Sequence, residues 1–139
     1  MALLEKAIAL AVEAHRGQKD RAGAPYILHP LRMMCRLETV PEKIVAVLHD
    51  VVEDTPWTFA GLKREGFPDE ILSALDCLTK HEGESYPHFV QRSARNPLAR
   101  RVKLADLEDN MDLKRIRTLT ARTVKRLAKY RRAWEQLNP

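Results

Sequence analysis

Cysteine and long apolar runs are scarce in this 139-residue chain, and each scarcity excludes a class of protein. The two cysteines, Cys35 and Cys77, lie in apolar helical patterns without a CxxC spacing, which predicts core thiols and excludes a disulfide framework or a thiolate zinc site. No apolar segment approaches the roughly 20 residues of a membrane helix. Because Glu5 and Glu13 interrupt the first apolar stretch, it is unlike a secretion signal, and we expect a cytoplasmic protein.

Aromatic residues are also scarce, at 6% of the chain, and this affects which partners its net charge of +5 could attract. The basic residues crowd the last third, between positions 92 and 132. They do not alternate with aromatic side chains as a base-stacking surface requires, so nucleic acid is not favoured as a partner. A basic surface also attracts small polyanions or simply solvates helices, and solvation is favoured for most of these residues.

Helical periodicity dominates the apolar pattern, and no segment shows a convincing strand alternation. The sequence therefore predicts an all-α fold in a single domain over residues 1–139. Thr39 and Glu42 have the spacing of a capping box, and Pro30 suits the first turn of a helix. Helices are expected over residues 4–15, 30–37, 39–55, 58–65, 69–78, 85–95, 97–111 and 121–137, with Pro30 in the first turn of the second.

The stretch LHDVVEDT, residues 48–55, places charged groups where a buried helix should continue. In a continuous helix, His49 lies one turn before Glu53 and Asp50 one turn before Asp54, on the arc opposite the apolar residues. Two acids and two groups of the metal-ligand type then project side by side. A solvated acidic face with an incidental histidine explains this stretch equally well when it is taken by itself.

A second anomaly is Asp106, which shares a helix face with Lys103 and Asn110 in an apolar neighbourhood. An unpaired carboxylate is costly there, so Asp106 is expected to have either a cation such as Lys103 or a metal as its partner. His29, immediately before Pro30, is by itself more often a capping or core histidine than a ligand.

Together, these residues provide two imidazoles and two carboxylates: His29, His49, Asp50 and Asp106. Mixed nitrogen and oxygen donors suit a divalent metal such as Mn²⁺, Fe²⁺ or Zn²⁺. Four protein ligands also leave coordination positions for water and substrate in an octahedral site. The set therefore predicts a metal site of the catalytic kind.

Four sequence words, in order, carry a specific resemblance: AHRGQ (14–18), GAPYILHP (23–30), LHDVVEDT (48–55) and VKLAD (102–106) with Asn110-Met111. They resemble the HD superfamily of metal-dependent phosphohydrolases. Within it, the chain is similar to the hydrolase domain of the RelA/SpoT alarmone enzymes and to the single-domain small alarmone hydrolases. The resemblance implies an all-α HD helical bundle with a metal site between helices.

The same resemblance implies an activity and a ligand set. The expected reaction is Mn²⁺-dependent removal of the 3′-pyrophosphate from guanosine tetra- or pentaphosphate, by attack of a metal-activated water. The substrate would be a small nucleotide polyphosphate, with no membrane partner. By motif, the metal ligands are again His29, His49, Asp50 and Asp106.

Roles for further residues also follow from the resemblance. Glu53 and Asp54 match the catalytic acidic pair, and Asn110 matches a residue expected to contact the nucleotide. A carboxylate beside the metal can orient water and accept its proton. The candidates for holding the leaving polyphosphate are Arg21, Lys80 and Lys103, although for any one of them an ordinary surface cation is favoured.

Four positions depart from the family pattern. They are Asp20, Leu107, Asp109 and Leu113, where arginine, arginine, histidine and threonine are usual. All four lie in the segments expected to read the base, whereas the metal ligands and acids are complete. Two alternatives therefore stay open: hydrolysis of another nucleotide or phosphoester, and a non-catalytic nucleotide sensor.

Overall fold

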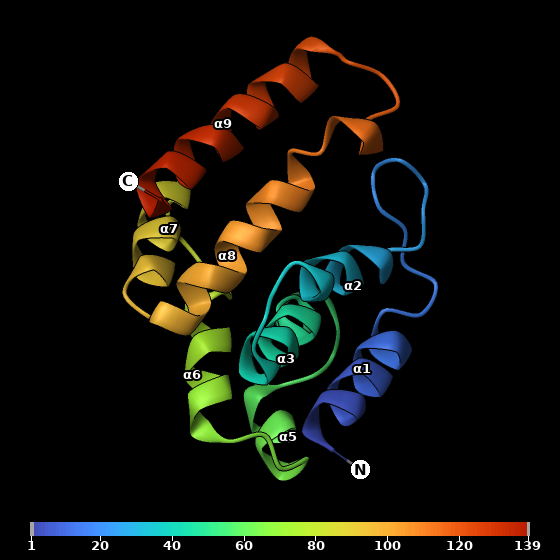
Figure 1. The fold of residues 1–139 in the computed structure, drawn as a ribbon, viewed down its shortest axis with the longest axis vertical. Helices are drawn as coiled ribbons and strands as arrows, with labels where there is room; N and C mark the ends of the chain where they lie inside the picture. Colours follow the sequence, from blue (N-terminus) through green and yellow to red (C-terminus); the bar gives the residue numbers. More distant parts are fainter. Residues whose placement is uncertain (1, 139) are drawn as a thin grey trace.

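The computed structural model describes residues 2–138, and over that range it consists of helices and connecting loops, which confirms the predicted fold class. Figure 1 shows a helical bundle in which a central helix is surrounded by others. The elements are α1 (Leu3–Ala14), α2 (Leu28–Cys35), α3 (Val40–Leu48), α4 (Val51–Asp54), α5 (Phe59–Arg64), α6 (Asp69–Cys77), α7 (Tyr86–Ala94), α8 (Pro97–Asn110), the 3-10 helix η1 (Leu113–Arg115) and α9 (Ala121–Leu137).

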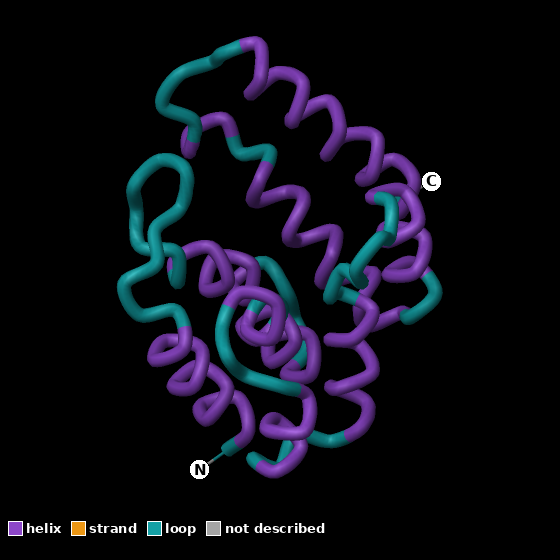
Figure 2. The backbone as a smooth tube through the Cα atoms, turned by 180° about the vertical axis from the view of Figure 1, so that it is seen from behind, coloured by secondary structure: helices purple, strands orange, loops and turns teal. Residues whose placement is uncertain are grey.

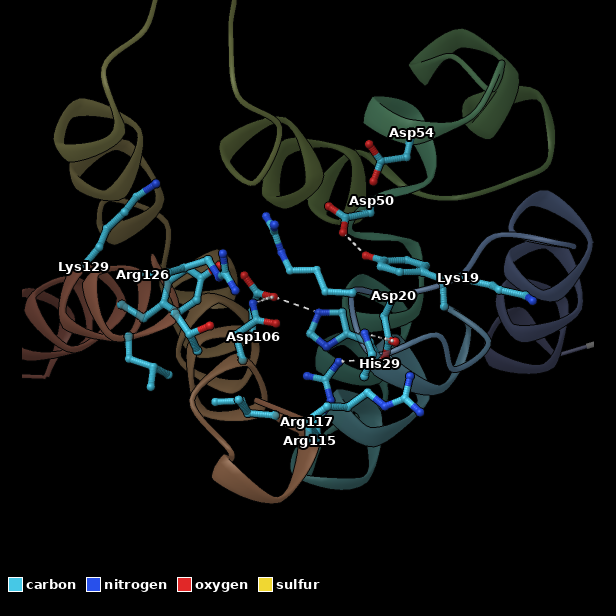
Figure 3. Close-up of a pocket in the computed structure, with 18 of the residues that line it drawn as sticks. Lys19, Asp20, His29, Asp50, Asp54, Asp106, Arg115, Arg117, Arg126 and Lys129 are labelled. Atoms are coloured by element: carbon cyan, nitrogen blue, oxygen red, sulfur yellow. Dashed lines mark hydrogen bonds and ion pairs between the residues drawn. The ribbon is translucent and has the colours of Figure 1, made fainter. Parts of the chain in front are cut away.

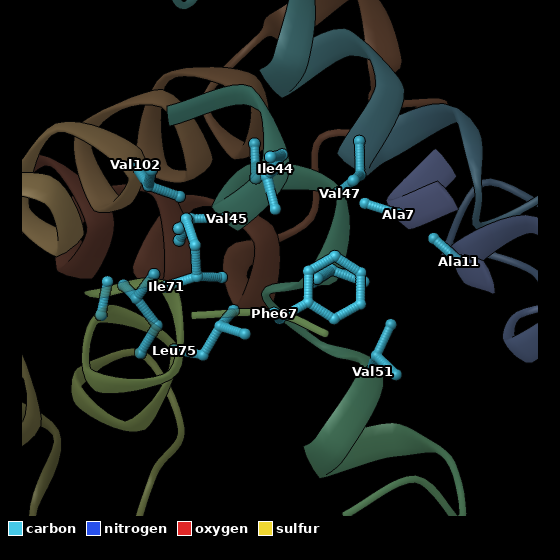
Figure 4. Close-up of a cluster of buried hydrophobic side chains, with 14 of the residues drawn as sticks. Ala7, Ala11, Ile44, Val45, Val47, Val51, Phe67, Ile71, Leu75 and Val102 are labelled. Carbon is cyan, nitrogen blue, oxygen red and sulfur yellow. The ribbon is translucent and has the colours of Figure 1, made fainter. Parts of the chain in front are cut away.

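Helix α3 forms the centre of the larger core because its side chains are apolar on nearly every face. All five residues from Ile44 to Leu48 are buried, and a helix that is apolar all round must be covered on all sides. Helices α1, α2, α6 and α8 pack against it. Side chains from four of these helices converge there in Figure 4, among them Ala7, Ala11, Val45, Val47, Ile71, Leu75 and Val102.

A second, smaller core joins α7, α8 and α9. It is built from Val90, Leu107, Ala133 and Leu137. Helix α8 contributes to both cores, because Ala99, Val102 and Ala105 on another face belong to the larger one. Helices α8 and α9 lie side by side and are joined through η1 at one end of the bundle (Figures 1 and 2).

The helix expected over 39–55 is interrupted at His49 and Asp50, so the prediction of a continuous helix was wrong there. The physical reason is a competing hydrogen bond. The Nδ1–H of His49 donates to the carbonyl of Ala46 at 2.8 Å, and the backbone N–H of His49 reaches the same carbonyl at 3.4 Å. That carbonyl would otherwise accept the N–H of Asp50, so the helix restarts only at α4.

Both cysteines were predicted to be core thiols, and the structure differs between them. Cys77 is half-buried, but Cys35 is exposed, so the prediction of a core thiol was wrong for Cys35. Cys35 is the last residue of α2 and lies beyond the buried Met33. None of the described helices is long and apolar enough to cross a membrane.

The predicted capping box at the start of α3 is confirmed. The hydroxyl of Thr39 accepts the N–H of Glu42 at 3.3 Å, and Glu42 Oε2 accepts the N–H of Thr39 at 3.1 Å. The other carboxylate oxygen accepts from Arg101 Nη1 at 3.0 Å. Burial by itself raises the pKa of Glu42, but these donors outweigh it and lower the pKa below its usual value.

Glu42→Gln should therefore destabilise the fold at neutral pH by about 1–2 kcal/mol, because hydrogen bonds to a charged carboxylate are lost. Since the folded pKa is depressed, this contribution is present above the unfolded pKa and disappears as pH falls through the folded pKa. Urea denaturation at pH 7 and in acid measures the difference. Glu38→Gln, at an exposed position, is the matched control, and a difference that persists unchanged in acid would contradict the assignment.

Candidate metal centre and active-site cavity

His29 enters the protein interior at the first turn of α2 and faces two carboxylates of α8. Its Nδ1 lies 2.6 Å from Asp109 Oδ2, and its Nε2 lies 2.9 Å from Asp106 Oδ1. Burial by itself lowers the pKa of His29, but the hydrogen bonds to Asp106 and Asp109 outweigh it and raise the pKa. The imidazole is therefore held between α2 and α8 by its two ring nitrogens.

His49, at the break after α3, has its second ring nitrogen aimed at the same place. Since the Ala46 carbonyl can only accept, Nδ1 carries the hydrogen, and in the neutral ring Nε2 carries the lone pair. Nε2 lies 3.1 Å from Asp50 Oδ2 and 3.7 Å from Asp106 Oδ1. Within residues 2–138 this buried atom has no partner with hydrogen-bond geometry. Burial lowers the pKa of His49, but the two carboxylates raise it to about 9.

Asp106 uses its two carboxylate oxygens differently. Oδ2 accepts from Lys103 Nζ at 2.8 Å, while Oδ1 faces His29 and accepts from Asn110 Nδ2 at 3.1 Å. Burial by itself raises the pKa of Asp106, but Lys103 and His29 lower it well below its usual value. The ion pair that the sequence offered as the alternative is thus present, and it leaves Oδ1 directed at the imidazoles.

The donor set fits a divalent metal ion. Ligand atoms of His29, His49 and Asp106 lie within 4.8 Å of one another, as do those of Asp50, Glu53 and Asp54. Asp50 joins the two groups through its contact with His49. Two imidazole nitrogens facing carboxylate oxygens, one of them an orphaned buried atom, are the nitrogen and oxygen donors expected of such a site. The four ligands predicted from the sequence are therefore brought together.

Tyr26 is a member of the site that the sequence did not identify. Its hydroxyl donates to Asp50 Oδ2, and its ring lies between those of His15 and His29. Burial raises the pKa of Asp50, but His49 and the Tyr26 hydroxyl lower it to about 2. The tyrosine thus holds Asp50 as an oriented carboxylate.

Glu53 and Asp54 project from α4 beside Asp50. Burial, followed by the charge of Asp50, raises the pKa of both carboxyl groups. The backbone N–H of Lys80 donates to Glu53 Oε1 at 3.2 Å and restrains that side chain. Both acids border the cavity next to the candidate metal ligands.

Gln18 connects the 15–27 loop to the end of α4. Its Oε1 accepts from His15 Nδ1 at 2.7 Å, and its Nε2 donates to the backbone carbonyl of Asp54 at 3.1 Å. Both residues belong to the AHRGQ word. These two hydrogen bonds explain the AHRGQ motif structurally, because they fix the end of α4, with Glu53 and Asp54, against the loop.

A cavity of about 850 Å³ opens over the site between the 15–27 loop and α9. Figure 3 shows Asp50 and Asp54 on one side and Arg126 and Lys129 across from them. The basic residues that line it are Lys19, Arg21, Lys103, Arg115, Arg117, Arg126 and Lys129. The acids Asp50 and Asp54 thus lie on the wall opposite Arg126 and Lys129. Elsewhere in the lining the charges alternate, because Lys103 pairs with Asp106 and Lys19 and Arg21 flank Asp20.

The residues predicted to contact substrate are placed differently from one another. Arg21 and Asn110 line the cavity, and Lys103 does so with its ammonium group on Asp106. Lys80 is not among the lining residues. Arg126 was expected to face solvent, but its side chain is half-buried at the cavity wall.

Sequence reasoning missed five cavity cations as substrate contacts. Two of them are Lys19, on the 15–27 loop, and Arg115, which pairs with Asp20 and Asp109. The other three are Arg117, Arg126 and Lys129. Within residues 2–138 none of the three forms an ion pair. Burial lowers the pKa of Lys129, and Lys80, Lys103 and Arg21 lower it further by repulsion. This wall carries uncompensated positive charge, which favours binding of a polyanion.

Removing one member of the buried ion pair should destabilise the protein. Asp106→Asn in chelator-treated protein leaves Lys103 buried without its partner and should cost about 3 kcal/mol or more in the free energy of unfolding. Lys103→Met should also destabilise, and the double variant should lose less than the sum, because both members of the pair are then absent. Urea denaturation measures all three, and strictly additive losses would contradict this coupling.

Comparisons with known proteins place the chain among longer relatives. No protein-family model matches it. It is 33% identical over 124 residues to the probable GTP pyrophosphokinase of Mycobacterium leprae (strain TN), covering 80% of this chain and 16% of the relative. It is 32% identical over 123 residues to the guanosine-3′,5′-bis(diphosphate) 3′-pyrophosphohydrolase of Aquifex aeolicus (strain VF5), covering 78% of this chain and 17% of the relative.

Two further matches agree with these. The bifunctional (p)ppGpp synthase/hydrolase SpoT of Escherichia coli (strain K12) is 31% identical over 122 residues, covering 78% of this chain and 17% of the relative. The chain spans about a sixth of the length of these curated relatives. A solved structure of a metazoan ortholog of SpoT that hydrolyzes ppGpp has the same fold, with a TM-score of 0.80 and 22% identity over 99% of this chain and 85% of that one. The predicted resemblance to the RelA/SpoT-type proteins and their HD hydrolase domain is thereby confirmed.

Proposed function

We propose that this chain is a metal-dependent phosphohydrolase that removes the 3′-pyrophosphate from guanosine tetra- or pentaphosphate. The observation that carries the proposal is one cavity in which ligand-type imidazoles and carboxylates face cations of α9 and the preceding connection that form no ion pair within residues 2–138. Two of the relatives are named for this hydrolysis. Others are named pyrophosphokinases, but this chain corresponds to only about a sixth of those proteins.

The metal ion would be held by His29, His49, Asp50 and Asp106, and we propose Mn²⁺ because mixed nitrogen and oxygen donors suit it. When bound, it supplies positive charge that polarises the phosphoryl group and acidifies a water. The chain keeps both imidazoles oriented for this purpose, because Nδ1 of each is engaged elsewhere and Nε2 points inward.

Glu53 is the proposed general base. Its raised pKa makes it a better proton acceptor than an ordinary carboxylate, and the backbone N–H of Lys80 keeps one of its oxygens in place. Asp54 shares its environment and can orient the same water. The acids therefore hold and move the proton of the attacking water, while the ligands fix its position relative to phosphorus.

The cationic wall would hold the polyphosphate. Arg126 and Lys129 come from successive turns of α9, and Arg117 comes from the connection before it. Phosphoryl transfer depends mainly on positioning and on neutralising negative charge. Cations that have no protein carboxylate as partner can supply both to a leaving pyrophosphate.

A second candidate function is hydrolysis of another nucleotide or phosphoester, and it is favoured by the residue at one end of the cavity, Asp20. There Asp20 lies where the alarmone enzymes have an arginine, and its carboxylate pairs with Arg115 at 3.3 Å. A carboxylate at this position recognises different groups from an arginine. The reaction class is common to both candidates, and only the base to be recognised differs.

Pyrophosphate release from guanosine tetraphosphate tests the proposal. Metal-stripped protein should be inactive, added Mn²⁺ should restore release, and His49→Ala should abolish it at the same Mn²⁺ concentration. Absence of release by protein that binds Mn²⁺ would remove this substrate and move the test to a panel of other nucleotides and phosphoesters. Binding of those compounds without turnover of any would overturn the enzyme assignment in favour of a sensor.

Glu53→Gln separates the base from the ligands. It should lower kcat by about 100-fold or more, since general bases contribute 10²–10⁴, while Mn²⁺ affinity stays close to that of the unmodified chain. Glu70→Gln, an exposed acid on α6, provides the matched control. Steady-state kinetics together with calorimetric Mn²⁺ titration measures both effects, and unchanged turnover would rule out this role for Glu53.

A further inference from the structure

Asp109 is the buried carboxylate on α8 that neither the ligand set nor the acidic pair includes. It is fully buried, with 0% of its surface exposed. Its carboxylate accepts from Arg32 Nε at 2.9 Å and from Arg115 Nη1 at 2.8 Å, and it meets His29 Nδ1 at 2.6 Å. A buried carboxylate with this many donors is held in a single orientation.

These contacts require a hydrogen on Nδ1 of His29. Because two guanidinium groups donate to Asp109, its carboxylate is ionised and can only accept hydrogen bonds. Nδ1 of His29 must therefore be the donor in their contact. Asp106, paired with Lys103, is ionised as well, so Nε2 also donates, to Asp106 Oδ1 at 2.9 Å, while the ring carries both hydrogens. A metal ion at Nε2 would replace that hydrogen, because Asp109 holds the one on Nδ1.

We propose that Asp109 is a positioning residue for metal binding, which fixes His29 in the Nδ1–H form and orients its Nε2 toward Asp106 and the metal. The proposal rests on the proposed metal site. A carboxylate that accepts from the outer nitrogen of a ligand histidine raises the basicity of the ligand and fixes its orientation. In this chain the carboxylate comes from the helix that also supplies Asp106, one turn away.

Arg115 extends this arrangement to the loop at the far side of the cavity. Its Nη2 lies 3.3 Å from Asp20 Oδ2, and the other oxygen of Asp20 accepts the N–H groups of Ala22 and Ala24, both at 2.9 Å. Asp20 and Asp109 are two of the four departures from the family pattern. The guanidinium of Arg115 bonds to both carboxylates, so the two departures belong to one hydrogen-bond network that also includes His29.

The test is Mn²⁺ affinity in Asp109→Asn. The amide can donate to Nδ1 and so permit the opposite form of His29, and loss of such a partner typically weakens metal affinity 10- to 100-fold. The dissociation constant for Mn²⁺, measured by calorimetry with metal-stripped protein, should rise by that factor. Glu108→Gln removes the same charge at the exposed neighbouring residue and should leave the constant within about twofold.

A second variant separates positioning from structure. Arg115→Gln removes a partner of Asp109 and the link to Asp20 but keeps the contact between Asp109 and His29. It should lower the melting temperature while changing the Mn²⁺ dissociation constant less than about threefold, because the hydrogen bond of the ligand remains. If both variants lower stability and neither weakens Mn²⁺ binding, Asp109 has only a structural role.

One spectroscopic readout does not depend on any variant folding. Nitrogen-15 NMR of histidine-labelled chain loaded with Zn²⁺ should show a hydrogen-bonded, slowly exchanging proton on Nδ1 of His29 and coordination through Nε2. Coordination through Nδ1, or an Nδ1 without a proton, would overturn the proposal. Failure of the unmodified chain to bind Mn²⁺ or Zn²⁺ would count against the metal site itself, whereas equal binding by Asp109→Asn would count only against this inference.

Discussion

Burial of Asp106 is the constraint on which the arrangement of the site depends. A carboxylate on the core side of α8 must be compensated, and the compensation comes from three directions: Lys103 one turn earlier, His29 on α2, and His49 at the end of α3. These contacts tie α8 to the central helix and bring the metal-ligand set together. The break after α3 serves the same end, because the hydrogen bond from His49 to the Ala46 carbonyl interrupts the helix and also points Nε2 at Asp50 and Asp106.

The cavity combines metal-ligand side chains with cations that are unpaired within residues 2–138, and the two kinds come mainly from different elements of the fold. Carboxylates and imidazoles come from α2, α3, α4 and α8, which pack in or around the larger core. The cations that face them, Arg117, Arg126 and Lys129, come from α9 and the connection before it, and α9 packs through the smaller core. Because α8 belongs to both cores, it sets the spacing between the two walls. A polyanion placed between them would meet the metal at one end and arginine and lysine at the other.

Three of the four proposed ligands, His49, Asp50 and Asp106, could be singled out as candidates because each breaks a local apolar pattern. His29 became a candidate only together with them, and the structure places it beside Asp106. The helices themselves were predicted well because their caps and breaks are local, as at Thr39 and Glu42. The basic wall was not predicted, because Arg126 and Lys129 have the same sequence pattern as a solvated helix face. Whether that face meets water or a cavity depends on how α9 packs on α8. Asp109 was visible only as a departure, since its main partners His29 and Arg32 lie about 80 positions earlier in the chain.

The most direct test of the central claim, that these side chains bind one metal ion, is anomalous diffraction from crystals of the metal-stripped chain soaked in Mn²⁺. A single strong anomalous peak is expected within coordination distance of His29 Nε2, His49 Nε2 and the carboxylates of Asp50 and Asp106. A peak elsewhere, or no peak at concentrations that saturate binding in solution, would contradict the claim.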